Sequence, residues 1–177
     1  MSSLASLLER NRAFAATDAR AKSPEIPFIP NALAYIITCI DPRTEPGEIL
    51  GVQLGDAIVQ RVVGGRVTPG VLRDVAYISY LLETKAPQGP WFELALIHHT
   101  DCGSTFLADA DLRADFAARG YDEEELAAIP VIDPAASVRA DVEKIVSAPQ
   151  VSPKIRVSGH VYDVKTGLVV TVVTAAS

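Results

Sequence analysis

The chain has 177 residues, a length typical of one domain, and 49% of them are hydrophobic while 21% are charged. This composition excludes a disordered or fibrous protein. The 22 acidic and 16 basic residues give a net charge of −6, which argues against nucleic acid or an anionic membrane as the partner. We therefore expect the chain to bind a small molecule or another protein subunit.

The N-terminal segment predicts an amphipathic helix followed by a proline-rich arm. Apolar residues recur there at helical spacing, namely Leu4, Leu7, Leu8 and Phe14. Prolines at positions 24, 27 and 30 then exclude a helix. We expect residues 1–30 to cross the domain or reach a neighbouring subunit, as one arm of a single domain that spans 1–177.

The expected location is cytoplasmic. The first twenty residues lack the basic-then-apolar pattern of a signal peptide. No apolar run approaches the ~18 residues that a membrane span needs. With only two cysteines, the chain also has too few for a disulfide scaffold.

Short apolar runs predict five β-strands with helical patterns between them. The candidate strands cover residues 34–39, 57–63, 92–98, 155–161 and 168–173. The first runs lack alternation, which is typical of parallel strands that are buried on both faces. The last two are most simply a hairpin. The pattern predicts an α/β fold with a mostly parallel central sheet flanked by helices and a C-terminal antiparallel strand.

Two helices have clear start signals, and a third helical region is expected between them. Thr68 before Pro69 and Asp133 before Pro134 each place a capping residue ahead of a proline. The second of these helices would bury an apolar stripe made of Val138, Val142, Ile145 and Val146. Residues 112–129 are acidic and rich in alanine, so we expect a helical segment that faces solvent.

Potential metal ligands follow two of the predicted strands. Cys39 ends the first strand, and His99 and Cys102 lie just after the third. Ligands bind at the carboxyl ends of strands in open α/β sheets, so these three side chains converge if their strands are neighbours. Two thiolates and one imidazole suit Zn²⁺ and leave a fourth tetrahedral position open, as in catalytic zinc sites.

Simpler interpretations of these residues stay open. A lone cysteine at a buried strand end is most often an inert core thiol. A redox pair of Cys39 and Cys102 would leave His99 unexplained and lacks a C-x-x-C spacing. His98 and His99 are adjacent and point to opposite sides of an extended segment, so only one is a ligand, and His99 fits the H-x-x-C spacing.

Asp41 and Arg43 follow Cys39 and are two residues apart, so on an extended segment their side chains could share a face. One interpretation is a solvated ion pair worth at most ~1 kcal/mol. The functional alternative is that Arg43 holds Asp41 ionised by a bidentate contact. Asp41 would then accept a proton from zinc-bound water.

These motifs, in this order, resemble the β-class carbonic anhydrases along most of the chain. The resemblance includes C-x-D-x-R from Cys39, a Gly64-Gly65 turn after Arg61, and HTDCG at 99–103. It ends with GHVYD at 159–163, which is similar to the last hairpin of that family. The length is closest to a compact microbial branch that also includes carbonyl sulfide hydrolases.

The resemblance implies a zinc enzyme that reversibly hydrates carbon dioxide to bicarbonate by zinc-bound hydroxide. One zinc per chain would be held by Cys39, His99 and Cys102, with Asp41 and Arg43 as the catalytic dyad. It also implies a homodimer or a dimer of dimers, in which the N-terminal helix packs on the partner subunit.

One departure from the family concerns the substrate pocket, which we expect to include Val62, Val63, Gly64 and Gly65. The family usually has Arg-Asn-Ala-Gly where this chain has Arg61-Val62-Val63-Gly64. A more apolar pocket also suits carbonyl sulfide or carbon disulfide, so hydrolysis of these substrates at the same zinc site is the alternative. A non-catalytic, zinc-stabilised binding module is a further alternative.

Overall fold

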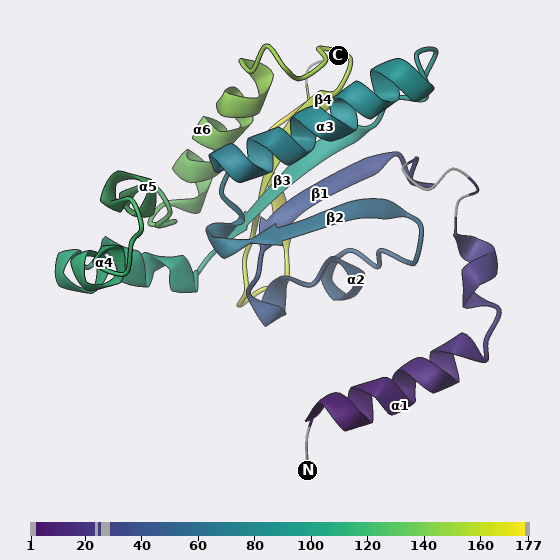
Figure 1. Ribbon diagram of the computed structural model, residues 1–177, viewed down its shortest axis with the longest axis horizontal. Coiled ribbons are helices and arrows are strands. Elements are labelled where there is room, and N and C mark those ends of the chain that lie inside the picture. Colours follow the sequence, from purple (N-terminus) through teal and green to yellow (C-terminus); the bar gives the residue numbers. More distant parts are fainter. Residues whose placement is uncertain (1–2, 24, 26–28, 176–177) are drawn as a thin grey trace.

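The computed structural model describes residues 3–23, 25 and 29–175, and its centre is a five-stranded sheet (Figure 1). The strands are β1 (Ala34–Cys39), β2 (Ala57–Val62), β3 (Glu93–His99), β4 (Arg156–Tyr162) and β5 (Val169–Val173). Their order is β2-β1-β3-β4-β5. The first four are parallel and β5 pairs antiparallel with β4, which confirms the predicted fold class and the C-terminal hairpin.

Two long helices, α3 (Pro69–Lys85) and α6 (Pro134–Val146), pack on one face of the sheet. Both predicted caps are present, because Thr68 accepts from the amide of Val71 and Asp133 accepts from two amides of the first turn. The helices bury Val71, Val75, Leu82, Val138, Val142 and Ile145 against the sheet. Val146 is 68% exposed, so its assignment to the buried stripe was wrong.

The opposite face of the sheet carries a smaller apolar cluster. Ile36 of β1 and Ile97 of β3 lie there, and Ile49 of the short helix α2 (Pro46–Ile49) packs against them. The edge strand β2 is only partly buried, with Val59 40% exposed. The expectation that β2 is buried on both faces is therefore wrong for the single chain, because β2 is the edge strand and the elements that pack on the sheet cover its faces only in part.

The acidic region between β3 and α6 folds as two short helices instead of one. These are α4 (Ala110–Ala117) and α5 (Glu123–Ala127). The backbone of Gly120 has a φ of 100°, which no helix accommodates, and Asp122 then caps α5. Most of the region faces solvent, as predicted.

The N-terminal helix α1 (Ser3–Ala15) lies away from the sheet, as Figure 1 shows. Its apolar side chains are exposed, among them Leu4, Leu7, Leu8 and Phe14. A 3-10 turn, η1 (Ala19–Lys22), follows α1. Pro24 and Pro27 of the predicted arm lie outside the described residues. Within the described part of the chain, every helix is too short or too polar to cross a bilayer.

A glycine in β4 sets how closely α6 approaches the sheet. A Cβ atom built on Gly159 would lie 3.0 Å from Cγ2 of Val142 and 3.2 Å from Cγ2 of Val138. Both valines belong to α6. The helix therefore sits where only a residue without a side chain fits beneath it.

Candidate metal centre

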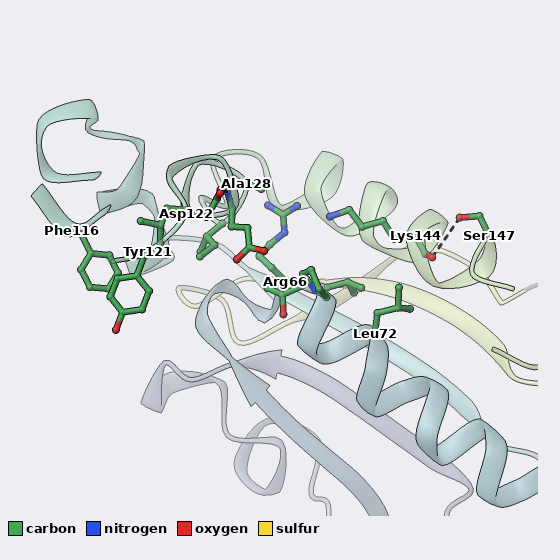
Figure 2. Close-up of a pocket in the computed structure, with 14 residues that line it drawn as sticks. Arg66, Leu72, Phe116, Tyr121, Asp122, Ala128, Lys144 and Ser147 are labelled. Carbon is green, nitrogen blue, oxygen red and sulfur yellow. Dashed lines mark hydrogen bonds between the residues drawn. The ribbon is translucent and has the colours of Figure 1, made fainter. Parts of the chain in front are cut away.

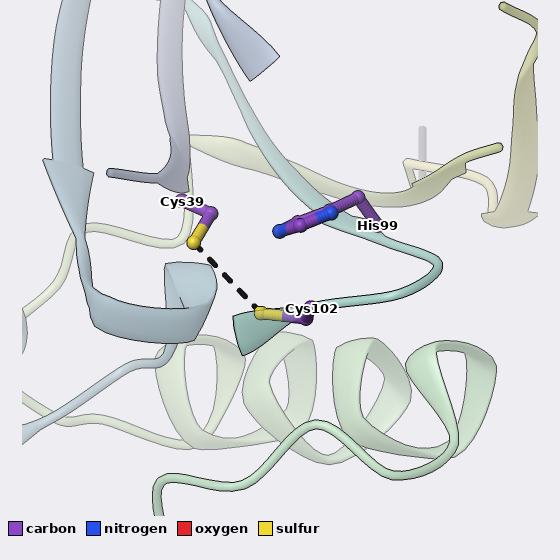
Figure 3. Close-up of side chains that lie close together, drawn as sticks. All are labelled: Cys39, His99 and Cys102. Carbon is purple, nitrogen blue, oxygen red and sulfur yellow. Dashed lines mark hydrogen bonds between the residues drawn. The ribbon is translucent and has the colours of Figure 1, made fainter. Parts of the chain in front are cut away.

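Cys39, His99 and Cys102 come together at the carboxyl edge of the sheet (Figure 3). Cys39 is the last residue of β1, His99 is the last residue of β3, and these strands are parallel neighbours. Their candidate ligand atoms all lie within 4.8 Å of one another, and all three residues are buried. The structure thus brings together the three residues that the sequence predicted to converge.

The distance between the two sulfur atoms distinguishes a disulfide bond from a pair of cysteines that bind one metal ion. The Sγ atoms of Cys39 and Cys102 are 3.9 Å apart, whereas a disulfide bond is about 2.05 Å long. Two sulfurs bound tetrahedrally to one zinc through bonds of about 2.3 Å would lie about 3.8 Å apart. The observed spacing therefore fits a shared metal ion.

The imidazole of His99 presents a free nitrogen to this site. Its Nδ1–H donates to the carbonyl oxygen of Thr100 at 2.9 Å, which leaves a lone pair on Nε2. This buried Nε2 has no hydrogen-bond partner among the described residues. His98 points elsewhere, with its Nε2 3.2 Å from the carbonyl oxygen of Gly65, so only His99 joins the two cysteines.

The hydrogen bond between the sulfurs shifts the two thiol pKa values in opposite directions. The contact with Cys102 raises the pKa of Cys39, and burial raises it further. The same contact lowers the pKa of Cys102 against the effect of burial. Ser104, whose Oγ lies 3.2 Å from the Cys102 sulfur, lowers it further. The site therefore favours a thiolate on Cys102, the form that binds metal.

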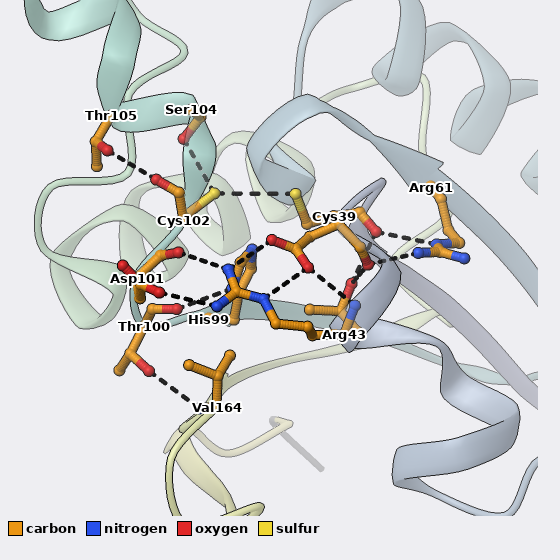
Figure 4. Close-up of polar contacts among 12 residues, drawn as sticks. Cys39, Arg43, Arg61, His99, Thr100, Asp101, Cys102, Ser104, Thr105 and Val164 are labelled. Atoms are coloured by element: carbon orange, nitrogen blue, oxygen red, sulfur yellow. Dashed lines mark hydrogen bonds and ion pairs between the residues drawn. The ribbon is translucent and has the colours of Figure 1, made fainter.

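Arg43, which Figure 4 shows near the cysteines, forms a bidentate ion pair with Asp41. Nε of Arg43 donates to Oδ1 of Asp41 at 3.0 Å, and Nη2 donates to Oδ2 at 2.7 Å. The pair lowers the pKa of Asp41 to about 2. The local backbone is not extended as expected: Asp41 caps the 3-10 turn η2 (Pro42–Thr44), and its Oδ1 also accepts the backbone N–H of Arg43.

Asp101 is a second partner of Arg43 that the sequence reasoning missed. Nη1 of Arg43 donates to its carboxylate at 2.8 Å, and Nη2 donates to its carbonyl oxygen at 2.9 Å. Asp101 has a φ of 54°, a conformation that aspartate tolerates better than most residues. The signal in the sequence that could have identified Asp101 was its position between His99 and Cys102. Arg43 thus joins the loop after β1 to the loop after β3.

Arg61 and Thr44 hold the backbone that carries Cys39 and Asp41, and neither was assigned a role from the sequence. Nε of Arg61 donates to the carbonyl oxygen of Cys39 at 3.0 Å, and Nη2 donates to that of Asp41 at 2.6 Å. Arg61 also pairs with Glu45. The hydroxyl of Thr44 donates to the carbonyl oxygen of Cys39 at 2.9 Å.

The residues predicted to line a substrate pocket lie next to Cys39. Val62 ends β2 opposite Cys39, and Val63, Gly64 and Gly65 form the 3-10 turn η3 (Val63–Gly65). Val63 is 42% exposed, while both glycines are buried. Their role in binding a substrate stays a prediction.

A separate cavity of about 640 Å³ lies among α3, α5 and α6 (Figure 2). Arg66, Leu72, Phe116 and Lys144 are among its lining residues, whereas the cysteines and the η3 turn are not. The cavity is therefore distinct from the site at the end of β1 and β3.

Comparison with known proteins identifies the family. No protein-family model matches the chain. The chain is 30% identical over 148 residues to β-carbonic anhydrase 1 of Mycobacterium tuberculosis, an alignment that covers 80% of this chain and 83% of the relative. The chain belongs to the β-carbonic anhydrase family.

Other members and neighbours of the β-carbonic anhydrase family support this relationship. The crystal structure of a carbonic anhydrase from Streptococcus mutans is 32% identical, with a TM-score of 0.75 and coverage of 97% of this chain and 98% of that one. A carbon disulfide hydrolase from Acidianus is 24% identical over 161 residues, covering 77% of this chain and 75% of the relative. The resemblance noted in the sequence is thus confirmed.

Proposed function

We propose that the chain is a zinc-dependent carbonic anhydrase that catalyses the reversible hydration of carbon dioxide to bicarbonate. The observation that carries this proposal is the meeting of Cys39, His99 and Cys102 within 4.8 Å, with Nε2 of His99 free among the described residues. Membership of the β-carbonic anhydrase family supports the same activity.

In this proposal Cys39, His99 and Cys102 hold one zinc ion, and their own contacts prepare them for it. The Nδ1–H bond of His99 to the carbonyl oxygen of Thr100 fixes the tautomer in which Nε2 is a ligand. Ser104 lies in hydrogen-bond contact with the Cys102 sulfur and accepts the backbone N–H of Val131. When zinc is bound, it lowers the pKa of a coordinated water from ~15.7 to about 7.

Asp41 and Arg43 then orient the reacting water. Arg43 keeps the pKa of Asp41 at about 2, so Asp41 is an anion at neutral pH. A carboxylate with so low a pKa accepts a hydrogen bond from water but does not retain the proton, which passes to buffer. Both oxygens of Asp41 are fixed by Arg43, and this leaves the carboxylate one orientation in which to accept that hydrogen bond.

Hydrolysis of carbonyl sulfide or carbon disulfide is the second candidate. Val62 and Val63 place branched hydrocarbon where the family usually has polar and small residues, and the chain is also similar to a carbon disulfide hydrolase. Both substrates are linear and apolar like carbon dioxide, so an apolar pocket would accept all three.

One set of assays on the zinc-loaded protein separates these activities. Stopped-flow measurement of carbon dioxide hydration is compared with sulfide release from carbonyl sulfide and from carbon disulfide. We expect the largest kcat/KM for carbon dioxide. A larger value for a sulfur substrate would replace the proposed activity with the second candidate. Background rates for all three substrates, equal in the wild type and Asp41→Asn, would indicate a zinc-stabilised binding module.

We also propose a homodimer, alone or paired into a dimer of dimers, in which α1 of one subunit packs on the other. The exposed apolar side chains of α1 and its position away from the sheet support this assembly. The N-terminal arm, residues 1–30, would then be the assembly segment of a single domain. The cytoplasmic location stays a prediction, which cell fractionation would test.

A further inference from the structure

Asp141 is a buried carboxylate on the apolar face of α6. It lies three residues after Val138 and is fully buried. Its Oδ2 accepts from Nε of Arg66 at 2.7 Å, and its Oδ1 accepts from Nη2 at 3.2 Å. Oδ2 also accepts the backbone N–H of Val67 at 3.1 Å, and Oδ1 accepts from Lys144 at 2.8 Å. A buried charge persists only where it is satisfied in this way.

The partners of Asp141 belong to the segments that carry the metal-ligand candidates. Arg66 and Val67 directly follow the η3 turn. His98, whose Nε2 lies 3.5 Å from Oδ2 of Asp141, directly precedes His99. That same Nε2 is 3.2 Å from the carbonyl oxygen of Gly65, so the turn and the end of β3 meet at one imidazole.

The η3 turn in turn lies against the two strand ends. Gly65 has a φ of 68°, and a Cβ atom built on it would lie 3.2 Å from the carbonyl carbon of Thr38, 3.3 Å from the backbone nitrogen of Cys39, and 3.3 Å from Cδ2 of His98. The turn therefore touches the residue before His99 and the backbone of Cys39 with no space between them.

The turn also lies close to Ser104, which contacts the third ligand candidate, Cys102. A Cβ atom built on Gly64, which has a φ of 70°, would lie 3.2 Å from Oγ of Ser104. That hydroxyl is 3.2 Å from the sulfur of Cys102. One turn, held by one carboxylate, thus contacts the surroundings of Cys39, His99 and Cys102.

We propose that Asp141 is a positioning residue for the metal centre, which acts by fixing the η3 turn and His98 against the ends of β1 and β3. Asp141 does not itself touch the three ligand candidates. The inference rests on the proposed zinc site, and it assigns to α6 a role in setting the spacing of the two sulfurs and the imidazole.

Two variants disrupt the ion pair between Asp141 and Arg66 in different ways. Asp141→Asn keeps the shape of the side chain but removes its charge. In the double variant Asp141→Leu with Arg66→Met, apolar side chains replace the buried ion pair, an exchange that folded proteins often tolerate. Ser79→Ala is the matched control: Ser79 is a buried polar residue of α3, and its hydroxyl accepts the backbone N–H of Ser152 at 2.8 Å, outside the contacts described above.

The test compares three readouts on full-length protein. Zinc affinity is measured by competition with a chromophoric chelator, and the sulfur-to-cobalt absorption bands are recorded on cobalt-substituted protein. The rate at which the buried thiols react with a disulfide reagent is measured on metal-free protein. The unfolding temperature of each variant is recorded alongside, and all assays are run well below it.

We expect both Asp141 variants to lose about tenfold or more in zinc affinity, as other changes around metal ligands do. Their cobalt bands should shift and their thiols should react at least threefold faster, while Ser79→Ala changes none of the three readouts. A folded double variant with unchanged zinc affinity, cobalt bands and thiol reactivity would overturn the proposal. If the wild type binds neither metal, the proposed function fails, and the thiol rates alone still decide whether Asp141 positions the site.

Discussion

The sulfur atoms of Cys39 and Cys102 lie 3.9 Å apart, although 63 positions separate the two residues in the chain. Parallel pairing of β1 with β3 brings them together, because both strands end at the same edge of the sheet. The site thus depends on the register of two neighbouring strands and on the short turn from His99 to Cys102.

Zinc content tests the three ligand candidates directly. We expect about one zinc per chain in the wild type and almost none after Cys39→Ser, His99→Ala or Cys102→Ser, because three protein ligands are the minimum of such a site. His160→Ala is the control, since this strand histidine bonds Ser158 and Thr171 instead. Elemental analysis of protein purified without chelator gives the answer. Full zinc content in the His99 variant would contradict the assignment.

Asp41→Asn should separate catalysis from metal binding. The variant keeps the side-chain shape but weakens the bond from Arg43, so we expect zinc content to stay and kcat for carbon dioxide hydration to fall about 100-fold. Stopped-flow rates and zinc analysis on the same preparation check both parts. Glu48→Gln, at an exposed position of α2, should leave kcat unchanged. An unaltered kcat in Asp41→Asn would remove Asp41 from the mechanism.

The acid stability of the protein should depend on Asp141. Burial alone raises the pKa of this carboxyl, but bonds from His98, Arg66 and Lys144 outweigh burial and hold it below the ordinary 3.8. A carboxyl with a depressed folded-state pKa stabilises the protein above its unfolded pKa of about 3.9, and this contribution is lost as the pH falls toward the folded-state value.

Urea unfolding of the wild type and Asp141→Asn between pH 7 and pH 3 measures how the stability contributed by Asp141 changes with pH. Near pH 7 the variant should be less stable by about 3–5 kcal/mol, the usual effect of breaking a buried ion pair. The difference should shrink as the pH falls from 5 to 3. A difference that is independent of pH would show that the charge of Asp141 does not stabilise the fold.

The apolar side of α1 should hold the subunits together. Leu7 and Leu8 are about half exposed in the single chain, and we expect Leu7→Ser with Leu8→Ser to convert a dimer into monomers. Sedimentation velocity measures the change. Glu9→Ser with Arg10→Ser, on the same helix, should leave the dimer intact. A wild type that sediments as a monomer, or an unaffected leucine variant, would contradict the proposed assembly.

Most of the sheet and the convergence of the three ligand candidates could be predicted from local patterns. The five apolar runs became the five strands with shifts of at most one residue at either end, because short buried runs between turn residues leave few other structures open. The convergence of Cys39, His99 and Cys102 was predictable because each lies at or just after the end of a strand, and both strands end at the same edge of the sheet. His99 could be chosen over His98 as the ligand candidate because adjacent side chains of a strand point to opposite sides and His99 fits the H-x-x-C spacing.

The supporting contacts were harder to predict because they join segments far apart in the sequence. Asp141 lies 75 positions from Arg66. Its place on the apolar face of a predicted helix is the only feature of the sequence that indicates a buried carboxylate. Asp101 pairs with Arg43 across 58 positions, through a left-handed backbone that no pattern in the sequence indicates. The partial burial of β2 was also missed, since edge and central strands have similar composition.

Gly159 of β4 determines how closely α6 packs on the sheet, and this matters for more than the two valines that lie above it. A methyl group at this position would lie 3.0 Å from Cγ2 of Val142 and 3.2 Å from Cγ2 of Val138, too close for either valine to keep its place on α6. Asp141 is carried on the same helix and bonds Arg66, so the position of α6 also determines where this ion pair lies. The absence of a side chain at this one position of β4 thereby sets the distance from the sheet at which α6 holds Asp141 against Arg66.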